Sequence, residues 1–434
     1  MLDTNLVMFL GFGLTLLLCA LRVPIGLAMG SSGIIGFGLL TGFEPAFRLV
    51  SHSVISTFSD YTMGLIPLFI LMGAVAVASG ISADLFRAAQ LWFGGFRGGL
   101  AAATIASCGG FAAICGSSAA TAATMTRLAL PEMKRYGYSE RLATGVIAAG
   151  GTLGVLIPPS IALAIYGLLT QQSIGLLFMA GVVPGIIAIA FYMLTARLWL
   201  MRRPEDAPAG IVPPLRERVV SLTRLSPIIL LCLTVIGGIY GGIFTPTEAG
   251  AVGATGAIVI AFASRRFSFE RLFISLTESV RTAAAILTIL AGALLFGYFL
   301  TITQTPQKVA QVLLDADLGA YGTLLVILAV MLVLGCVMDS AAVVILTVPI
   351  VYPIITQLGF DPIWFGVIVT MTVEIGMISP PFGLNVFVIK GISKNTDIWE
   401  IYKGVAPFIL ADIVRIAVMI LFPSLVLFLP NLLR

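Results

Sequence analysis

Long apolar segments with few charges alternate with short polar stretches along most of the chain. Most of these segments approach the roughly 20 residues that a helix needs to cross a bilayer. None shows the strict alternation of a membrane β-barrel strand. The segments lie near 5–20, 24–41, 62–80, 142–172 and 174–200, and again near 226–243, 246–263, 282–301, 361–389 and 404–430. The pattern predicts an all-α polytopic membrane protein.

Two further apolar regions are too long for one crossing and are interrupted by small or polar residues. Residues 98–131 are broken at "CGSS", and residues 320–357 are broken at "MDSAA". Because a helix rises only about 1.5 Å per residue, each region suits a helical hairpin that enters and leaves the membrane on one side. We therefore expect two re-entrant hairpins in addition to the crossing helices.

Two of the crossing segments contain adjacent prolines within apolar sequence. The first reads "GVLIPPSIALAIYG" within 142–172, and the second reads "GMISPPFGLNVFVIKG" within 361–389. Proline removes a backbone donor and clashes with the preceding turn, which costs about 3 kcal/mol in a helix interior. Both segments are therefore predicted to be broken helices.

A single constant displacement along the chain relates these features. It carries Gly154 onto Gly376, Pro158 onto Pro380, and "SSAA" at 117–120 onto "DSAA" at 339–342. We expect two homologous repeats, residues 1–201 and 225–434, joined by a linker at 202–224. Each repeat has five crossings, and an odd number makes the two repeats inverted relative to each other.

Composition and charge agree with a membrane protein and orient it. Hydrophobic residues make up 59% of the chain and charged residues 10%, against about 25% charge in soluble domains. With the N-terminus outside, nearly all Lys and Arg fall on the cytoplasmic side. This orientation predicts periplasmic N- and C-termini and a cytoplasmic linker. The amphipathic segments at 43–58 and 267–280 are interpreted as interfacial arms that brace the structure against the membrane.

Several classes of chemistry are excluded by what the sequence lacks. The single histidine, His52, has no neighbouring ligand, and the five cysteines show neither metal nor disulfide spacing. No P-loop for ATP is present, and dispersed basic residues give no nucleic-acid signal. No catalytic constellation can be assembled, so we expect no enzyme activity and no cofactor.

The helix breaks suggest binding sites. Unwound backbone at membrane depth is tolerated only where it lines a buried site, because lipid cannot satisfy its polar groups. Helix starts suit anions and free carbonyls suit sodium, so two equivalent cation sites with an anion site between them are expected. The alternative is that Ser117, Ser118, Asp339 and Ser340 merely cap helices. Asn385 follows the second break and is a candidate substrate contact, whereas the equivalent position holds Leu163.

Charged residues inside the apolar segments are costly and need partners. Glu374 is open to three interpretations: a cation ligand, a proton site, or a structural hydrogen-bond anchor, of which we favour the anchor. Asp412 and Arg415 are three residues apart and form a neutralising pair on one helix face. Glu248 is expected to cap the helix that follows "FTP".

Four stretches together resemble the large membrane subunit of tripartite ATP-independent periplasmic (TRAP) transporters, over essentially the whole chain. They are "GSSAATAATM", "GTLGVLIPPSIALAIYG", "GGIFTPTEAGAVGA" and "EIGMISPPFGLNVFVIKG". The resemblance implies a sodium-driven importer of organic acids, such as sialic acid or C4-dicarboxylates, in the bacterial inner membrane. It also implies an elevator-like architecture of the ion transporter superfamily. The implied partners are a separate four-helix small membrane subunit and a periplasmic substrate-binding protein.

The resemblance also implies site residues, with sodium held largely by backbone carbonyls. The first sodium site would use Ala112, Cys115, Ser117, Ser118, Gly154, Ile157 and Pro159. The second would use Gly335, Asp339, Gly376, Ser379 and Phe382. Candidate substrate-binding residues are Ser118, Thr121, Ser340 and Asn385.

One alternative remains, a stand-alone sodium/carboxylate symporter of the same fold that needs no partner. Such a protein must read its own substrate and should place a cationic side chain near the midplane. Arg127 is the sequence candidate for that role. Delegating recognition to a binding protein would explain why so few such residues are present.

Overall fold

The computed structural model describes residues 3–208, 210 and 214–432, which form helices and connecting loops with no β-strand among them. The first half contains α1 (Thr4–Ala20), α2 (Ile25–Thr41), α3 (Phe43–Ser59), η1 (Tyr61–Gly64), α4 (Leu65–Ala78), α5 (Ile81–Phe93), α6 (Gly99–Cys115), α7 (Ser118–Arg135), α8 (Glu140–Leu156), α9 (Ile161–Thr170), α10 (Ile174–Arg202) and η2 (Pro204–Asp206). The second half contains α11 (Leu215–Tyr240), α12 (Pro246–Ala263), α13 (Phe269–Ile302), α14 (Thr305–Asp315), α15 (Gly319–Val337), α16 (Ser340–Gln357), α17 (Pro362–Gly376), α18 (Leu384–Ile392), α19 (Ile398–Leu421) and α20 (Pro423–Leu432). The prediction of an all-α protein is confirmed.

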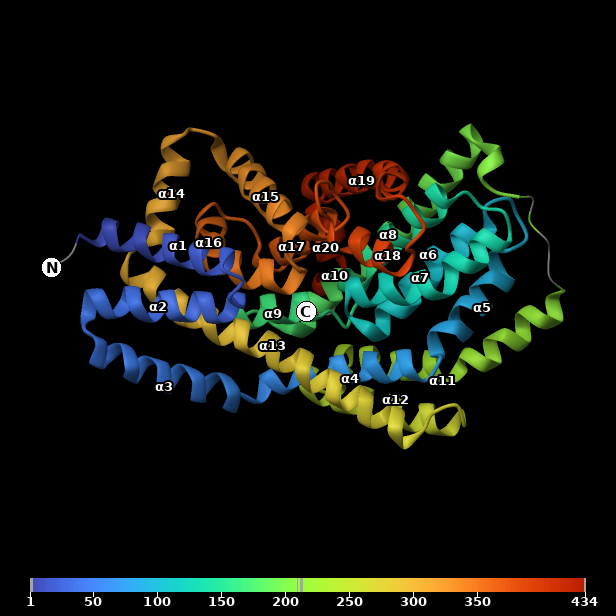
Figure 1. The fold of residues 1–434 in the computed structure, drawn as a ribbon, viewed down its shortest axis with the longest axis horizontal. Coiled ribbons are helices and arrows are strands. Elements are labelled where there is room, and N and C mark those ends of the chain that lie inside the picture. The colour runs from blue at the N-terminus through green and yellow to red at the C-terminus, as the bar shows by residue number, and fades with distance from the viewer. Residues whose placement is uncertain (1–2, 209, 211–213, 433–434) are drawn as a thin grey trace.

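The helix bounds of the two halves correspond when one half is shifted by the displacement that carries Gly154 onto Gly376. The shift pairs α6 with α15, α7 with α16, α8 with α17 and α9 with α18. The α6–α7 hairpin lies at the right of Figure 1 and the α15–α16 hairpin at the left, on opposite sides of the centre.

The helices form two layers (Figure 1). In the lower layer, α13 packs along α2, α3 and α4, while α12 packs against α4 and α11. In the upper layer, α8 is surrounded by α6, α7, α10 and α19, and α15 packs against α17. The layers meet where α4 contacts α6 and where α13 contacts α16. Both hairpins therefore lie against a wall formed by α4 and α13.

Both predicted helix breaks are present. Helix α8 ends at Leu156, and α9 begins at Ile161, where the Ser160 hydroxyl accepts a hydrogen bond from the Leu163 amide at 3.2 Å. Helix α17 ends at Gly376, and α18 begins at Leu384 after Gly383, whose φ is +66°. The Pro-Pro bonds in both breaks are cis.

Three expectations about element bounds are corrected. The arm at 267–280 and the span at 282–301 form one helix, α13, because no proline interrupts the sequence between them. The last predicted span, 404–430, is two helices, because α19 ends at Leu421 and α20 begins at Pro423. Helix α11 already begins at Leu215 within the predicted linker, since "LRER" favours helix. Residues 209 and 211–213 of that linker lie outside the described residues.

The first amphipathic segment is a helix of its own, as expected. Helix α3 covers Phe43–Ser59 and ends where the Asp60 carboxylate accepts a hydrogen bond from the Thr62 amide at 2.7 Å, which starts η1 and α4. The arm at 43–58 is a separate helix because Asp60 caps the element that follows it. The arm at 267–280 continues directly into the rest of α13.

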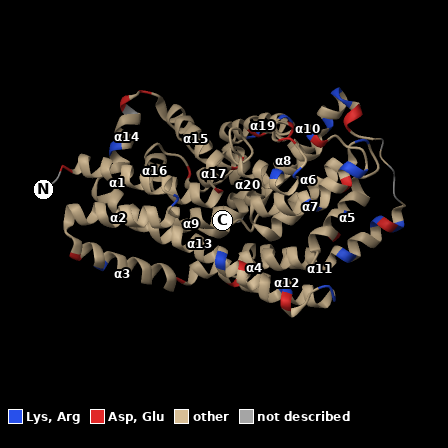
Figure 2. Cartoon of the chain, in the orientation of Figure 1, with Lys and Arg blue, Asp and Glu red and all other residues tan. Residues whose placement is uncertain are grey.

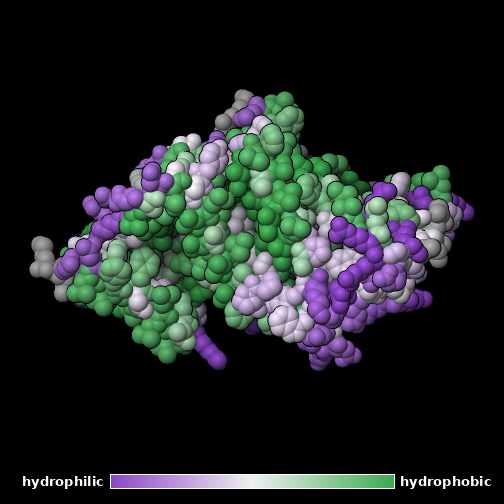
Figure 3. Space-filling view, turned by 90° about the horizontal axis from the view of Figure 1, so that it is seen from above, coloured by the Kyte–Doolittle hydropathy of each residue, from purple (hydrophilic) through white to green (hydrophobic). Residues whose placement is uncertain are grey.

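The surface is that of a membrane protein. Nine helical stretches among the described residues are long and apolar enough to cross a bilayer. A continuous hydrophobic surface covers much of the molecule in Figure 3, with hydrophilic regions towards its ends. Basic side chains are concentrated near the end of the molecule where α10 ends and α11 begins (Figure 2).

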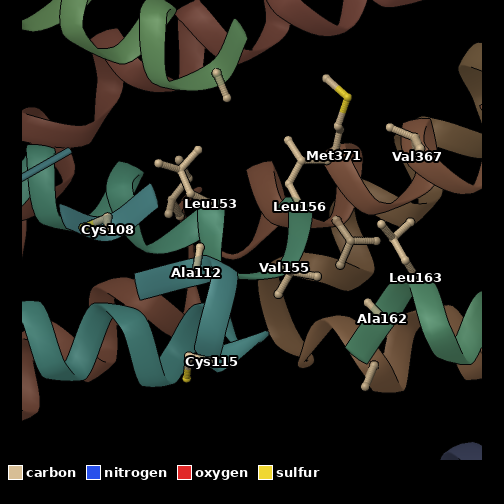
Figure 4. Packing of buried hydrophobic residues seen from close by; sticks show 14 of the residues in the cluster. Cys108, Ala112, Cys115, Leu153, Val155, Leu156, Ala162, Leu163, Val367 and Met371 are labelled. Atoms are coloured by element: carbon tan, nitrogen blue, oxygen red, sulfur yellow. The ribbon is translucent and has the colours of Figure 1, made fainter. Parts of the chain in front are cut away.

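Small buried residues allow the helices around the first break to approach closely. Figure 4 shows Cys108 and Ala112 of α6 near Leu153 of α8, while Leu156 lies beside Met371 of α17. All five side chains are essentially inaccessible to solvent. This close packing holds the end of α8 against α6 and α17.

Candidate functional site

The first hairpin tip lies directly against the first helix break. A Cβ atom added to Gly116 would be 2.7 Å from the Pro159 carbonyl oxygen, and one added to Gly154 would be 2.5 Å from the Ser117 carbonyl oxygen. Gly116 also has φ +63°, a conformation that side chains disfavour. The structure thus brings Ser117, Gly154 and Pro159 together, and only glycine permits these two approaches.

The second hairpin meets the second break through its first arm, α15. A Cβ atom on Gly376 would be 2.5 Å from the Leu332 carbonyl oxygen, and one on Gly335 would be 2.7 Å from the Val373 carbonyl oxygen. The Gly383 amide donates to the Cys336 carbonyl at 3.0 Å. Gly335 and Gly376, predicted to share a site, are therefore in backbone contact.

Each hairpin is completed by a helix from the other half of the chain. Helix α7 packs against α18, and α16 packs against α9. At the first of these contacts, the Asn385 side-chain amide donates to the Ser118 hydroxyl at 2.8 Å, and both residues are buried. The Asn385 Oδ1 atom has no hydrogen-bond partner among the described residues. A buried oxygen without a partner can accept a bond from a ligand or coordinate a cation.

A cavity of about 620 Å³ lies between the two hairpin tips and the α4–α13 wall. The first tip contributes Cys115 and Ser117, and the second contributes Asp339 and Ser340. The cavity therefore joins residues from both predicted sodium sites with a candidate substrate residue.

The cavity wall also carries two guanidinium groups. Arg127 of α7 was the sequence candidate for a cation at the site, and it lines the cavity. Arg271 of α13, which the sequence analysis places in the interfacial arm at 267–280, lines it as well. The Arg271 Nη1 atom donates to the Arg266 carbonyl at 3.0 Å and to the Ala78 carbonyl at 3.4 Å. Sequence reasoning missed Arg271 because it treated 267–280 as a separate arm.

Other predicted site residues lie behind the cavity surface. The Ala112 carbonyl accepts a bond from the Gly116 amide at 3.2 Å, and the Ile157 side chain faces Gly109 and Gly185. The Thr121 hydroxyl donates to the Ser117 carbonyl at 2.8 Å.

The residues within the second break are held by hydrogen bonds from backbone amides and hydroxyl groups. The Ser379 amide donates to the Gly376 carbonyl at 3.0 Å. The side chain of Phe382 is 51% exposed, and the Tyr402 hydroxyl donates to its carbonyl at 2.6 Å. Tyr402 is a further residue that sequence reasoning did not find.

A buried charged cluster lies next to the site. Asp412 and Arg415 form the predicted ion pair at 2.7 Å, and both side chains are 1% exposed. The Tyr192 hydroxyl donates to the Asp412 carboxylate at 2.8 Å and shares a bond with the Thr152 hydroxyl at 2.7 Å. Glu374 is also buried, but its carboxylate oxygens have no hydrogen-bond partner among the described residues. Because the Ser118 hydroxyl is a neighbour of this carboxylate, the hydrogen-bond anchor stays a prediction for Glu374.

The prediction for Glu248 is confirmed. Its carboxylate accepts a bond from the Thr245 amide at 2.8 Å, and its own amide donates to the Thr245 hydroxyl at 3.3 Å. This reciprocal capping box begins α12.

Many apolar helices, with two hairpin tips and two helix breaks around a shared cavity, define a multi-pass membrane transporter. The family model for the DctM component of tripartite ATP-independent periplasmic transporters matches residues 12–425. The chain belongs to this family and is the large permease subunit of a TRAP transporter. Consistent with the sequence prediction, it is a transporter subunit and not an enzyme.

Individual relatives carry the same description. The chain is 36% identical over 403 residues to the C4-dicarboxylate TRAP transporter large permease protein DctM of Pseudomonas aeruginosa, covering 92% of this chain and 94% of that protein. It is 29% identical to the sialic acid TRAP transporter permease protein SiaT of Haemophilus influenzae, covering 96% of this chain and 67% of that protein. The solved YdaH transporter of Alcanivorax borkumensis has a similar fold, with a TM-score of 0.64, 16% identity, and coverage of 95% of this chain and 98% of that one.

Proposed function

We propose that this chain imports an organic acid that carries a carboxylate, using the sodium gradient. The observation that carries the proposal is the cavity between the hairpin tips, whose wall contains Arg127 and Arg271. A guanidinium offers several donors in a fixed planar arrangement that suits a carboxylate. The two relatives described above are named for C4-dicarboxylates and for sialic acid, which are both carboxylates.

The same tips supply oxygen atoms suited to sodium, a hard cation. Ser117 of the first tip and Asp339 of the second face one cavity, and the Asn385 Oδ1 atom nearby has no partner among the described residues. Backbone carbonyls at the tips and breaks would complete two sodium sites, one in each half. Sodium bound there would place positive charge beside the carboxylate of the substrate and thereby couple the binding of both.

The proposed mechanism is an elevator. The upper layer, with both hairpins and both broken helices, would move along the wall formed by α4 and α13 and carry the cavity across the membrane. Two inverted repeats, 1–201 and 225–434, would give the outward and inward states equivalent geometry. The N- and C-termini would then be periplasmic and the linker cytoplasmic, in the bacterial inner membrane.

The family implies two further components. We propose a separate small membrane subunit of four helices and a periplasmic binding protein that delivers the substrate. The second candidate is a stand-alone symporter of the same fold. Such a symporter needs a cationic side chain to bind its own substrate. The sequence offered Arg127 alone for that role, whereas the cavity wall contains both Arg127 and Arg271. Gentle detergent purification of the tagged chain followed by mass spectrometry distinguishes the two. A stoichiometric small partner supports the tripartite system, and recovery of the intact chain alone supports the symporter.

Uptake into proteoliposomes tests the substrate class and the coupling. The chain and its small subunit are reconstituted, the binding protein is added outside, and uptake of labelled succinate or sialic acid is measured with an inward gradient of sodium or of potassium. We expect uptake of one of these acids with sodium only. Equal uptake with both gradients would refute sodium coupling.

Variants of the cavity wall test the site itself. Arg127→Gln with Arg271→Gln should reduce uptake at least tenfold, because each charge-assisted bond contributes about 1.5–3 kcal/mol. Arg197→Gln is the matched control, since Arg197 lines a different cavity beside Arg97 and Leu200. Full uptake in the double variant would refute the assignment of the cavity.

A further inference from the structure

A second large cavity lies away from the hairpin tips, between α10 and α19. It has a volume of about 860 Å³, and four basic residues line it, namely Arg141, Arg202, Arg203 and Lys403. The rest of its lining is mainly apolar and, among the described residues, contains no carboxylate. We propose that this cavity is a binding site for an anionic phospholipid, with the headgroup at the basic end and an acyl chain along the apolar walls.

The basic end has positive charge left over after its ion pairs are counted. Glu400 pairs with Arg141 at 2.7 Å and with Lys403 at 3.0 Å, so one carboxylate serves two cations. Arg202 and Arg203 have no ion-pair partner within 4.0 Å in the part of the chain that the structure describes. This unbalanced charge favours a ligand with a phosphate group.

Trp199 fixes the geometry of the basic end. The Arg203 guanidinium lies over the Trp199 ring, 5.7 Å from its centroid. The nearby Asp206 carboxylate accepts a bond from the Trp199 indole at 2.6 Å. The acid thus orients the aromatic ring, and tryptophan is typical of the level at which lipid headgroups lie.

The apolar walls run away from the basic end along both helices. On α10, Leu194 and Leu198 precede Arg202 at intervals of four residues and share its face. On α19, Leu410 and Val414 follow Lys403 on one face in the opposite chain direction. These four apolar side chains are 47–63% exposed. The basic side chains of both helices therefore lie at the same end of the cavity, and the apolar side chains of both helices extend from that end.

This order matches a phospholipid and not a small soluble anion. A soluble phosphate would use only the basic end and would leave the exposed leucines facing lipid or water. A lipid satisfies both parts, because its phosphate neutralises the arginines and its chain covers the apolar groove. Basic recesses between membrane helices are known to bind anionic headgroups in this manner.

Native mass spectrometry of the purified full chain in detergent provides the test. The chain is titrated with phosphatidylglycerol and with phosphatidylcholine of the same acyl composition. We expect a preference for phosphatidylglycerol, and Arg202→Gln with Arg203→Gln should weaken its binding roughly 30-fold. Arg265→Gln with Arg266→Gln, an adjacent basic pair just after the end of α12 in which Arg266 pairs with Asp84 at 3.0 Å, is the control and should bind as the unmodified chain does.

A third variant tests the groove. Leu198→Trp narrows the apolar wall without changing charge, and it should weaken binding of phosphatidylglycerol at least severalfold. The proposal would be overturned by equal binding of the two lipids, by equal loss in the control pair, or by release of the lipid by millimolar glycerol phosphate. Full binding in Leu198→Trp would also overturn it, because a surface attraction alone needs no groove. Thermal unfolding of every variant establishes that it is folded.

Discussion

The hydrogen bond between Asn385 and Ser118 joins the two halves of the chain at the candidate site, and it can be dissected by a double-mutant cycle. In Ser118→Ala, the buried Asn385 amide loses its acceptor, which costs about 1–3 kcal/mol. In Asn385→Leu, the remaining Ser118 hydroxyl can rotate to another acceptor, so the expected cost is about 1 kcal/mol. The double variant removes both polar groups, and its stability should return to within about 1 kcal/mol of the original chain.

The chain itself shows that leucine is acceptable at this position. The constant displacement along the sequence equates Ser118 with Ser340 and Asn385 with Leu163, and α16 packs against α9 as α7 packs against α18. Ser340→Ala is therefore the matched comparison, because it strands no amide group. It should leave stability unchanged while reducing sodium-coupled uptake, since Ser340 lines the cavity.

Two assays on the same samples separate structure from function. The thermal unfolding midpoint of Ser118→Ala in detergent should fall by roughly 1–3 °C, because the unfolding entropy of a chain this long converts about 1 kcal/mol into about 1 °C. Sodium-coupled uptake should fall in Ser118→Ala and in Asn385→Leu. It should stay low in the stable double variant, because that variant lacks the Asn385 Oδ1 atom. Full uptake in the double variant would refute a binding role for this pair. Additive effects on stability would refute the energetic importance of the bond.

The remaining predictions concern the breaks, a close helix contact and the buried ion pair. Pro158→Ala with Pro380→Ala should favour continuous helices and abolish uptake, and uptake at the original rate would contradict the role of the breaks. Gly376→Ala should lower the unfolding temperature and uptake, because the added Cβ atom would lie 2.5 Å from a backbone carbonyl oxygen of α15. Gly391→Ala is the control, because open space surrounds that position, and it should change neither quantity. Asp412→Asn should destabilise the protein by about 3–5 kcal/mol by leaving a buried arginine without its counterion, and an unchanged unfolding midpoint would show that the pair is dispensable.

Much of the architecture is encoded in short stretches of sequence. Apolar segments of sufficient length, paired prolines and small polar residues at hairpin tips act through local backbone geometry, so they predict elements from neighbouring residues alone. The breaks after Leu156 and Gly376 are therefore found where the sequence predicts them. The Glu248 capping box and the pairing of Asp412 with Arg415 belong to the same category, because three residues separate the partners.

Errors arose where local signals were weak. The continuous helix α13 was expected as two elements, because its amphipathic first turns differ in composition from the apolar turns that follow. Helicity depends on the absence of a breaker rather than on the change in polarity, so the helix continues. This continuity is what places Arg271 on the wall of the cavity.

The sequence by itself determined the membrane class, most of the helices and the two breaks, and it predicts the repeat that relates them. Tertiary structure alone decided that α7 meets α18 and that α16 meets α9, so that each hairpin is completed by the other half. The residues of the Asn385–Ser118 bond are 267 positions apart, and no local pattern reports such a contact. Their meeting follows from how the helices pack in three dimensions, because the free energy of packing depends on the shape of both surfaces at once.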